Sequence, residues 1–289
     1  MKKILLYGSI ALSTLSCSTS SEDTPFDNSD PSTQNVILPT KMNKDGIVMK
    51  INYNGTKIIS MINNINHGQR IEFTYTDDYV TGIKNYENNV LESTVEYGYS
   101  GGRMASAVTK EYSTTGTVQN TVTFTYTYTS TTEINVKRQT NSGTAGSSTI
   151  NSVFTYNNGN MVSNVGSGTG IINGNTVTYT EKETYTYTDK NYPFKNVKGF
   201  DKIIFNGNES SDGVSMLFSN IKNSLSTYKG QFTNTTAGGG TGTGTSSHKY
   251  TTTFNTAGYP SEESRQTLDI NGNPMTSTPD RFMYEYNYQ

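Results

Sequence analysis

The segment Thr121-Val-Thr-Phe-Thr-Tyr-Thr-Tyr-Thr129 alternates threonine with aliphatic or aromatic residues at every position. Successive side chains of a β-strand point to opposite faces, so this period of two places the apolar residues on one face and the threonines on the other. β-branched and aromatic residues are also the types that favour strands. The segment therefore predicts a strand with one buried and one solvated face.

The same alternation recurs along the chain and indicates an all-β protein. It appears in Glu72–Tyr75, Glu96–Tyr99, Val153–Tyr156, Thr184–Tyr187 and Tyr284–Tyr288. Hydrophobic residues make up only 31% of the chain, although it contains 21 tyrosines and 11 phenylalanines. A sheet that is solvated on one face needs an apolar residue at every second position only, which reconciles the two observations.

Turn signals separate the predicted strands at a regular spacing. Asn-Gly suits a type I′ hairpin, because both central residues take positive φ. We expect such hairpins at Asn54-Gly55, Asn158-Gly159, Asn173-Gly174, Asn206-Gly207 and Asn271-Gly272, and Gly101-Gly102 can form one too. Tyr97, Tyr126, Tyr156 and Tyr187 stand 29, 30 and 31 residues apart, which indicates a degenerate repeat of hairpins.

The N-terminus has the pattern of an export signal that ends at the one cysteine of the chain. Lys2 and Lys3 precede a short apolar run, and Ser16 stands immediately before Cys17. The run is shorter than the ~20 residues that a membrane helix needs. Residues 1–16 therefore resemble a lipoprotein signal peptide, with Thr14 where a lipobox has leucine. The resemblance implies that Cys17 is acylated and holds the protein at the outer membrane; ordinary secretion is the alternative.

Residues 17–35 have almost no apolar content, so we expect them to form a disordered tether. The acidic pair Glu22-Asp23 resembles the surface-export signal of Bacteroidota lipoproteins, and retention on the periplasmic side is the alternative. The chain has a net charge of −2 and no basic stripe, which argues against nucleic acid as a partner.

Two segments carry a family resemblance. Phe154-Thr-Tyr-Asn-Asn-Gly-Asn-Met161 and Tyr97-Gly-Tyr-Ser-Gly-Gly-Arg-Met104 look like the YD-type repeat of Rhs-like proteins, with an aromatic pair, a polar turn and an apolar strand start. Together with the signal at Cys17, the chain resembles degenerate YD-repeat-like lipoproteins of the Bacteroidota. The resemblance implies a curved antiparallel meander and no particular activity.

We expect residues 36–289 to form a single domain: a long, twisted antiparallel meander curled into an open or partial barrel, because strand twist makes large sheets curl. One stretch breaks the alternation. Val214, Leu217, Phe218, Ile221 and Leu225 follow helical spacing. This predicts one amphipathic helix near residues 213–228 that covers a face of the sheet.

Candidate catalytic and metal-binding residues are few. Ser100 matches G-x-S-x-G, but that motif works at a strand-to-helix turn, and here it falls in a predicted hairpin. His67 and His248 are the only histidines and are expected in solvated loops. Asp269 to Asp280 has the oxygen spacing of a calcium loop but carries Pro274 where glycine is required. We therefore predict no enzyme activity, no cofactor and no metal.

Other polar features are interpreted as surface. The glycine tract Gly238–Gly244 predicts a flexible loop, and Glu181 and Glu183 are expected on the polar face of a strand. The threonines of Thr121–Thr129 form a hydroxyl row, for which solvation is preferred over ice or polymer binding.

Three functional classes follow. The favoured one is a non-catalytic, lipid-anchored envelope protein that binds or scaffolds an envelope protein or a glycan. The second is a carrier or sensor of an apolar ligand held between sheet and helix, with Leu217, Phe218 and Ile221 as the ligand or packing face. The third, a hydrolase, requires a nucleophile, a base and an acid to meet in the fold.

Overall fold

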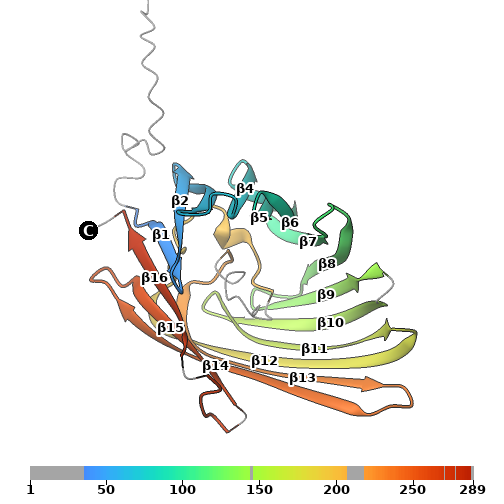
Figure 1. The fold of residues 1–289 in the computed structure, drawn as a ribbon. Helices are drawn as coiled ribbons and strands as arrows, with labels where there is room; N and C mark the ends of the chain where they lie inside the picture. Colours follow the sequence, from blue (N-terminus) through green and yellow to red (C-terminus); the bar gives the residue numbers. More distant parts are fainter. Residues whose placement is uncertain (1–35, 144–145, 207–217, 270, 277, 288–289) are drawn as a thin grey trace, which may run out of the picture.

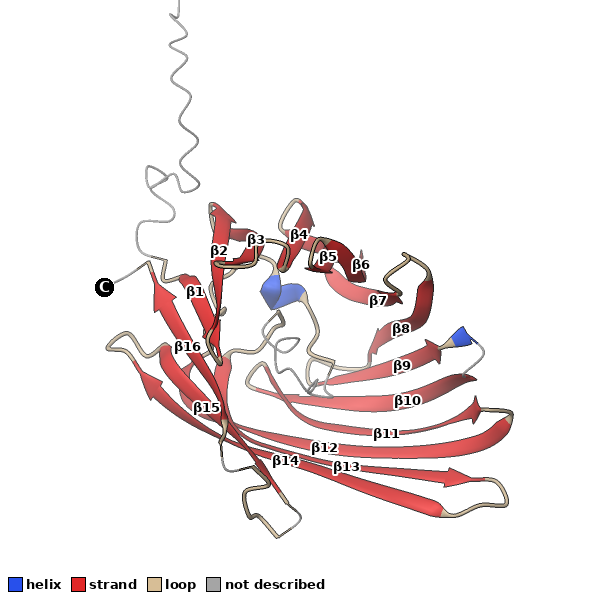
Figure 2. Cartoon of the chain, in the orientation of Figure 1, coloured by secondary structure: helices blue, strands red, loops and turns tan. Residues whose placement is uncertain are grey.

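The computed structural model describes residues 36–143, 146–206, 218–269, 271–276 and 278–287. Within them, sixteen antiparallel strands form one closed barrel, in which each strand pairs with its neighbours in the chain (Figure 1). Strand dominates the chain, as Figure 2 shows. The strands are β1 Pro39–Lys44, β2 Ile47–Asn54, β3 Lys57–Asn63, β4 Arg70–Thr76, β5 Tyr79–Glu87, β6 Val90–Ser100, β7 Arg103–Tyr112, β8 Val118–Tyr128, β9 Glu133–Asn141, β10 Gly146–Asn157, β11 Asn160–Ile172, β12 Asn175–Asn191, β13 Asn223–Thr236, β14 Thr241–Phe254, β15 Pro260–Leu268 and β16 Asp280–Tyr286.

The prediction of an all-β antiparallel meander is confirmed, but the prediction of an open or partial barrel is wrong. The first and last strands pair, with Met42 opposite Tyr284 and Lys44 opposite Phe282. Closure satisfies the backbone groups that two free edge strands would expose. The predicted signal peptide, residues 1–16, the tether, residues 17–35, and Cys17 lie outside the described residues.

The predicted helix near residues 213–228 is also wrong. Residues 213–217 lie outside the described part of the chain, residues 218–222 are irregular, and β13 begins at Asn223. Within β13, Leu225 pairs with Tyr187 of β12. The pairing of β13 with both β12 and β14 overrides the local helical spacing, because strand ladders on two sides satisfy its backbone.

Several predicted hairpins are confirmed by the backbone angles. Asn158-Gly159, Asn173-Gly174 and Gly101-Gly102 have positive φ at both residues, as a type I′ turn requires. Asn54 instead ends β2, and the turn is made by Gly55 and Thr56. Asn206 lies in the connection from β12 to β13, and Asn271-Gly272 lies in the connection from β15 to β16, where Gly272 has a φ of 85°.

The strands of the barrel turn their apolar residues inward. On β12, Val177 and Tyr185 are buried, whereas Thr180, Lys182 and Thr184, which lie between them in sequence, are exposed and face outward. The predicted solvation of the threonine row on β8 agrees with this arrangement, since Thr125 and Thr127 are exposed. The wall therefore has an apolar inner face and a polar outer face.

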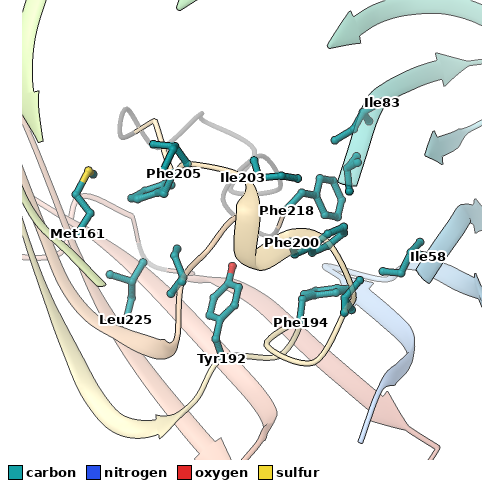
Figure 3. Packing of buried hydrophobic residues seen from close by; sticks show 14 of the residues in the cluster. Ile58, Ile83, Met161, Tyr192, Phe194, Phe200, Ile203, Phe205, Phe218 and Leu225 are labelled. Atoms are coloured by element: carbon teal, nitrogen blue, oxygen red, sulfur yellow. The ribbon is translucent and has the colours of Figure 1, made fainter. Parts of the chain in front are cut away.

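The connection between β12 and β13 fills part of the lumen. Its described residues, 192–206 and 218–222, include a 3₁₀ turn at Phe200–Lys202 and enter the barrel from the end that carries both termini (Figure 2). Phe200 and Phe218 pack against Phe73 of β4, with ring centroids 5.7 and 5.1 Å away. Phe194 contacts Tyr284 of β16 at 6.4 Å. Figure 3 shows Phe194, Phe200 and Phe218 close together. We call residues 192–206 and 218–222 the lumen segment.

Tyrosines near the ends of β2, β6, β8, β12 and β16 each bind the strand that precedes them in the chain. Each hydroxyl donates to a backbone carbonyl near the start of the preceding strand. The pairs are Tyr53 to Pro39 (2.6 Å), Tyr99 to Val80 (2.8 Å), Tyr128 to Met104 (3.0 Å), Tyr187 to Met161 (2.6 Å) and Tyr286 to Pro260 (2.8 Å). These strands are connected by turns only at their other end, so the hydroxyls hold together ends that no turn joins. Of the four tyrosines in the sequence repeat, Tyr187 makes this bond, whereas the Tyr126 hydroxyl donates to Asn206, so the bond does not explain the repeat as a whole.

Removing one of these hydroxyls tests their contribution. Tyr53→Phe leaves the buried acceptor at Pro39 without its donor, and we expect it to lower the free energy of unfolding by about 1–3 kcal/mol. The control Tyr112→Phe removes a hydroxyl that contacts Thr94 on the outer face at 3.3 Å, and we expect a change below about 0.5 kcal/mol. Urea unfolding of the three proteins measures both values. Equal effects would contradict the account.

The lumen segment is tested by truncating its central ring. Phe200 is 1% exposed, so Phe200→Ala should lower the free energy of unfolding by about 3–5 kcal/mol through the cavity that it leaves. Val153 on the outer face is 37% exposed, and Val153→Ala serves as the control with little expected effect. If Phe200→Ala unfolds at the same urea concentration as wild type, the segment does not support the barrel.

Candidate functional site

The two ends of the barrel differ. Both ends of the described chain, Val36 and Asn287, lie at the end where the lumen segment enters, which we call the closed end (Figure 1). The opposite end carries the turns after the odd-numbered strands, and we call it the mouth. At the closed end the lumen segment bonds to several parts of the wall: Lys198 donates its backbone N–H to Thr56 (3.0 Å), and Ile204 donates to the Met104 sulfur (3.1 Å). The Tyr126 hydroxyl also donates to Asn206.

Two cavities lie inside the barrel between the lumen segment and the mouth. The larger has a volume of about 680 Å³ and is lined by residues of β5 to β10 and β12 and by the lumen segment. The smaller, about 350 Å³, is lined by residues of β1, β2, β4, β5 and β6, by Gln69 in the loop before β4 and by Phe218. Asn85, Val95, Tyr97 and Phe218 line both. Cavities of this size accommodate small organic ligands.

The lining of the larger cavity changes in polarity with depth. Its floor consists of the lumen-segment residues Ile203, Ile204, Phe205 and Phe218. Tyr97 and Phe124 lie next to this floor, since each stands far along its strand from the mouth. Polar residues gather on the parts of the strands nearer the mouth, namely Asn85, Ser93, Thr109, Glu111, Thr140 and Ser148. The cavity thus offers an apolar interior and a polar rim.

A hydrogen-bonded carboxylate pair lies in the wall below the rim. Glu181 and Glu183 are buried on the inner face of β12, so their predicted surface placement is wrong. Arg138 on β9 donates to Glu181 at 2.6 Å, and its side chain lines the larger cavity. Ser152 and Asn164 also donate to Glu181, at 2.8 and 3.2 Å. A buried carboxylate requires such partners.

Glu183 accepts hydrogen bonds from three side chains. They are Asn164 at 2.8 Å, Tyr185 at 3.0 Å and Tyr228 at 3.0 Å. Burial nevertheless raises the pKa of the Glu183 carboxyl above its ordinary value, because the loss of water outweighs the donated bonds. The protonated form is therefore favoured in the folded protein relative to the unfolded chain.

The structure places the predicted ligand face in the core. Leu217 lies outside the described residues. Phe218 and Ile221 are 7% and 3% exposed, and both belong to the cluster of buried hydrophobic residues inside the barrel. Phe218 also lines both cavities, so this residue does reach a space in which a ligand can lie.

The candidate catalytic residues do not meet. Ser100 ends β6 at the closed end, whereas His67 is exposed in the loop after β3 at the mouth. The prediction that His248 lies in a loop is wrong: it is on β14, and its ring stacks on Tyr228 with centroids 5.4 Å apart. The predicted glycine loop is also partly wrong, because Gly242 and Gly244 belong to β14. Among the described residues no group of three His, Cys, Asp or Glu side chains is placed to hold a metal ion.

The outer face of the barrel has the composition of a water-facing surface. Lysines project outward from the middle of many strands and are exposed at Lys50, Lys84, Lys137, Lys182, Lys229 and Lys249. A barrel that spans a bilayer needs an outward apolar band, and a lysine at the bilayer midplane costs about 2–4 kcal/mol. Thr, Ser, Asn and Gln occupy most of the other outward positions, so the described strands do not present such a band.

No helix among the described residues is long and apolar enough to cross a membrane.

Comparison with solved structures gives a fold likeness. No protein-family model matches the sequence, and a search of curated proteins finds no match. A crystal structure of a porin-like protein from Bacteroides vulgatus ATCC 8482 superposes with a TM-score of 0.53 over 88% of this chain and 100% of the other. The two sequences are 13% identical, so the likeness concerns the barrel fold alone. Neither the signal at Cys17 nor the YD-type repeat is tested by these comparisons.

The buried carboxyl of Glu183 makes a pH-dependent contribution to stability. Because its folded pKa is raised above 4.5, this contribution is complete below pH 4.5 and is lost as the pH rises toward the raised value. Glu183→Gln keeps the hydrogen-bonding shape without the ionisation, so its unfolding free energy should lack this decline. Urea unfolding from pH 4 to 8, read as the difference between the two proteins, checks this. A difference that is constant with pH would contradict it.

Proposed function

We propose that the protein is a non-catalytic binding protein of the cell envelope. In this proposal the acylated Cys17 anchors it at the outer membrane, and the barrel stands in water and holds a small ligand in its lumen at the mouth. The observation that carries the proposal is the pair of cavities above an apolar floor, inside a wall whose outer face is polar.

The filled closed end favours binding over passage. A barrel of sixteen or more strands leaves an aqueous channel when its lumen is polar and unobstructed. Here the lumen segment packs from Phe73 on one side to Tyr284 on another and hydrogen-bonds to the wall between them. A solute that enters at the mouth therefore meets a buried aromatic floor, which suits retention of a ligand.

The cavities above the lumen segment also support the second class expected from the sequence, a carrier of an apolar ligand, with the lumen segment in place of the expected helix. Within the described part of the chain no helix covers the sheet, but Phe218 of the lumen segment occupies the place expected of the helix and forms part of the cavity floor. We therefore assign ligand binding to the lumen, with Asn85, Val95 and Tyr97 as the wall residues that both cavities share.

The lumen site is tested with a neutral fluorescent probe, N-phenyl-1-naphthylamine. We expect saturable binding at one site per protein, and we expect Val95→Trp to abolish it, because the larger ring occupies both cavities. The control is Val108→Trp, which places the same ring on the outer face of β7, opposite Glu96. Binding that survives Val95→Trp, or that both variants lose, would contradict a lumen site.

The anchor is tested in cells. Radiolabelled palmitate should label the wild-type protein and the control Ser18→Ala, whereas Cys17→Ala should remain unlabelled and should no longer fractionate with the outer membrane. Labelling of Cys17→Ala would refute acylation at this residue. Protease treatment of intact cells separates the two sides: loss of the protein from intact cells indicates surface display, and loss only after permeabilisation indicates a periplasmic orientation.

A further inference from the structure

Among the described residues that line the larger cavity, Arg138 is the one cation, and it is set below the rim. Arg138 stands on the inner face of β9, two residues from Thr140 on the side away from the mouth. Its side chain is 19% exposed. The opposing charge on the cavity lining, Glu111, lies nearer the mouth and is exposed to solvent. Arg138 and Glu181 carry opposite charges 2.6 Å apart, so the pair has no net charge, and the arginine acts on a ligand through its directed N–H donors.

The guanidinium of Arg138 is held in a fixed direction. Its Nη2 donates to Glu181 at 2.6 Å, and Glu181 is itself fixed by Ser152 and Asn164. Within the described part of the chain, Glu181 is the partner that receives a hydrogen bond from this guanidinium, and four of its five N–H groups have no such acceptor. A guanidinium is a planar fork that matches the oxygens of a carboxylate or a phosphate.

An apolar surface lies within the same cavity. Ile204 and Phe218 form its floor, and Phe124, which pairs with Arg138 across β8 and β9, continues that surface up the wall. A ligand that contacts both the floor and the guanidinium must combine an apolar body with an anionic group. A purely apolar ligand would leave the guanidinium buried without a further acceptor, and a purely polar one would leave the aromatic floor uncovered.

We infer that the lumen binds an anionic amphiphile, whose apolar body rests on Ile204 and Phe218 and whose head-group oxygens accept hydrogen bonds from Arg138. This inference rests on the proposed ligand binding in the lumen and names the class of ligand. Carboxylate and phosphate head groups share the required chemistry, since both present oxygens to a planar donor pair.

Competition against N-phenyl-1-naphthylamine tests the inference. We expect dodecanoate and dodecyl phosphate to displace the probe from the full-length protein at concentrations at least about tenfold lower than dodecanol does, as one charge-assisted hydrogen bond requires. The stronger of the two anions identifies the head group. Equal displacement by anionic and neutral chains would overturn the inference while leaving lumen binding intact. Failure of the probe to bind at all would instead overturn the proposed function.

Variants at Arg138 test the assigned residue. Arg138→Gln combined with Glu181→Gln removes the guanidinium without leaving an unpaired buried carboxylate, and it should abolish the preference for anions while dodecanol still displaces the probe. Arg138→Lys keeps the charge and should retain part of the preference. Lys137→Gln, one residue away on the outer face, is the control and should behave as wild type. An unchanged preference in the double variant would overturn the assignment, as would an equal loss of binding for all chains.

Discussion

The apolar inner face of a wide barrel is the constraint on which the rest of the structure depends. About eight strands enclose an interior that wall side chains alone can fill, and wider barrels leave a space along the axis. Near the closed end the inner residues of the sixteen strands are mostly Met, Ile, Val, Phe and Tyr, and without a filling they would line that space with apolar groups in contact with water. The lumen segment removes this contact, because Phe194, Phe200 and Phe218 fill the closed end. The two cavities lie between these rings and the mouth.

The same alternation determines the solvent outside the barrel. Every residue that is turned inward leaves its neighbours facing outward, and on β12 those neighbours are Thr180, Lys182 and Thr184. A shared barrel fold does not decide whether a wall faces lipid or water; the residues on its two faces do. This is why a likeness to a porin-like structure and a water-facing outer wall are compatible. It is also why we propose that an acyl chain, and not the barrel itself, holds the protein at the membrane.

Much of the fold follows from the sequence, because its strands and turns are local features. Thr121–Thr129 predicts its strand correctly, and Asn158-Gly159 predicts its hairpin. Closure was missed because the pairing of Met42 with Tyr284 joins distant parts of the chain. The helix prediction is wrong because Phe218 and Ile221 reach the core from an irregular segment and Leu225 reaches it from β13. A spacing of three to four apolar residues does not distinguish a helix from an irregular segment followed by a strand.

The candidate site was harder to predict than the fold. Glu181 and Glu183 stand at odd-numbered positions of β12, as do Tyr185 and Tyr187, so the alternation of the strand places all four on the inner face. The negative charge of the two glutamates instead favours the outer, solvent-facing side of the strand. Arg138 gave a similar signal through its parity with Ile134 and Val136. The partners of these residues come from β9 to β13, so their network becomes visible only once the strands are in register.

Folding without detergent tests the central claim, that the barrel has an apolar, filled interior and a water-facing wall, most directly. The non-acylated Cys17→Ala protein in plain buffer should be monomeric by size-exclusion chromatography, give a β-sheet circular dichroism spectrum and unfold cooperatively. A protein that aggregates in buffer, folds only in detergent or lipid, and then conducts ions across a bilayer would contradict the account.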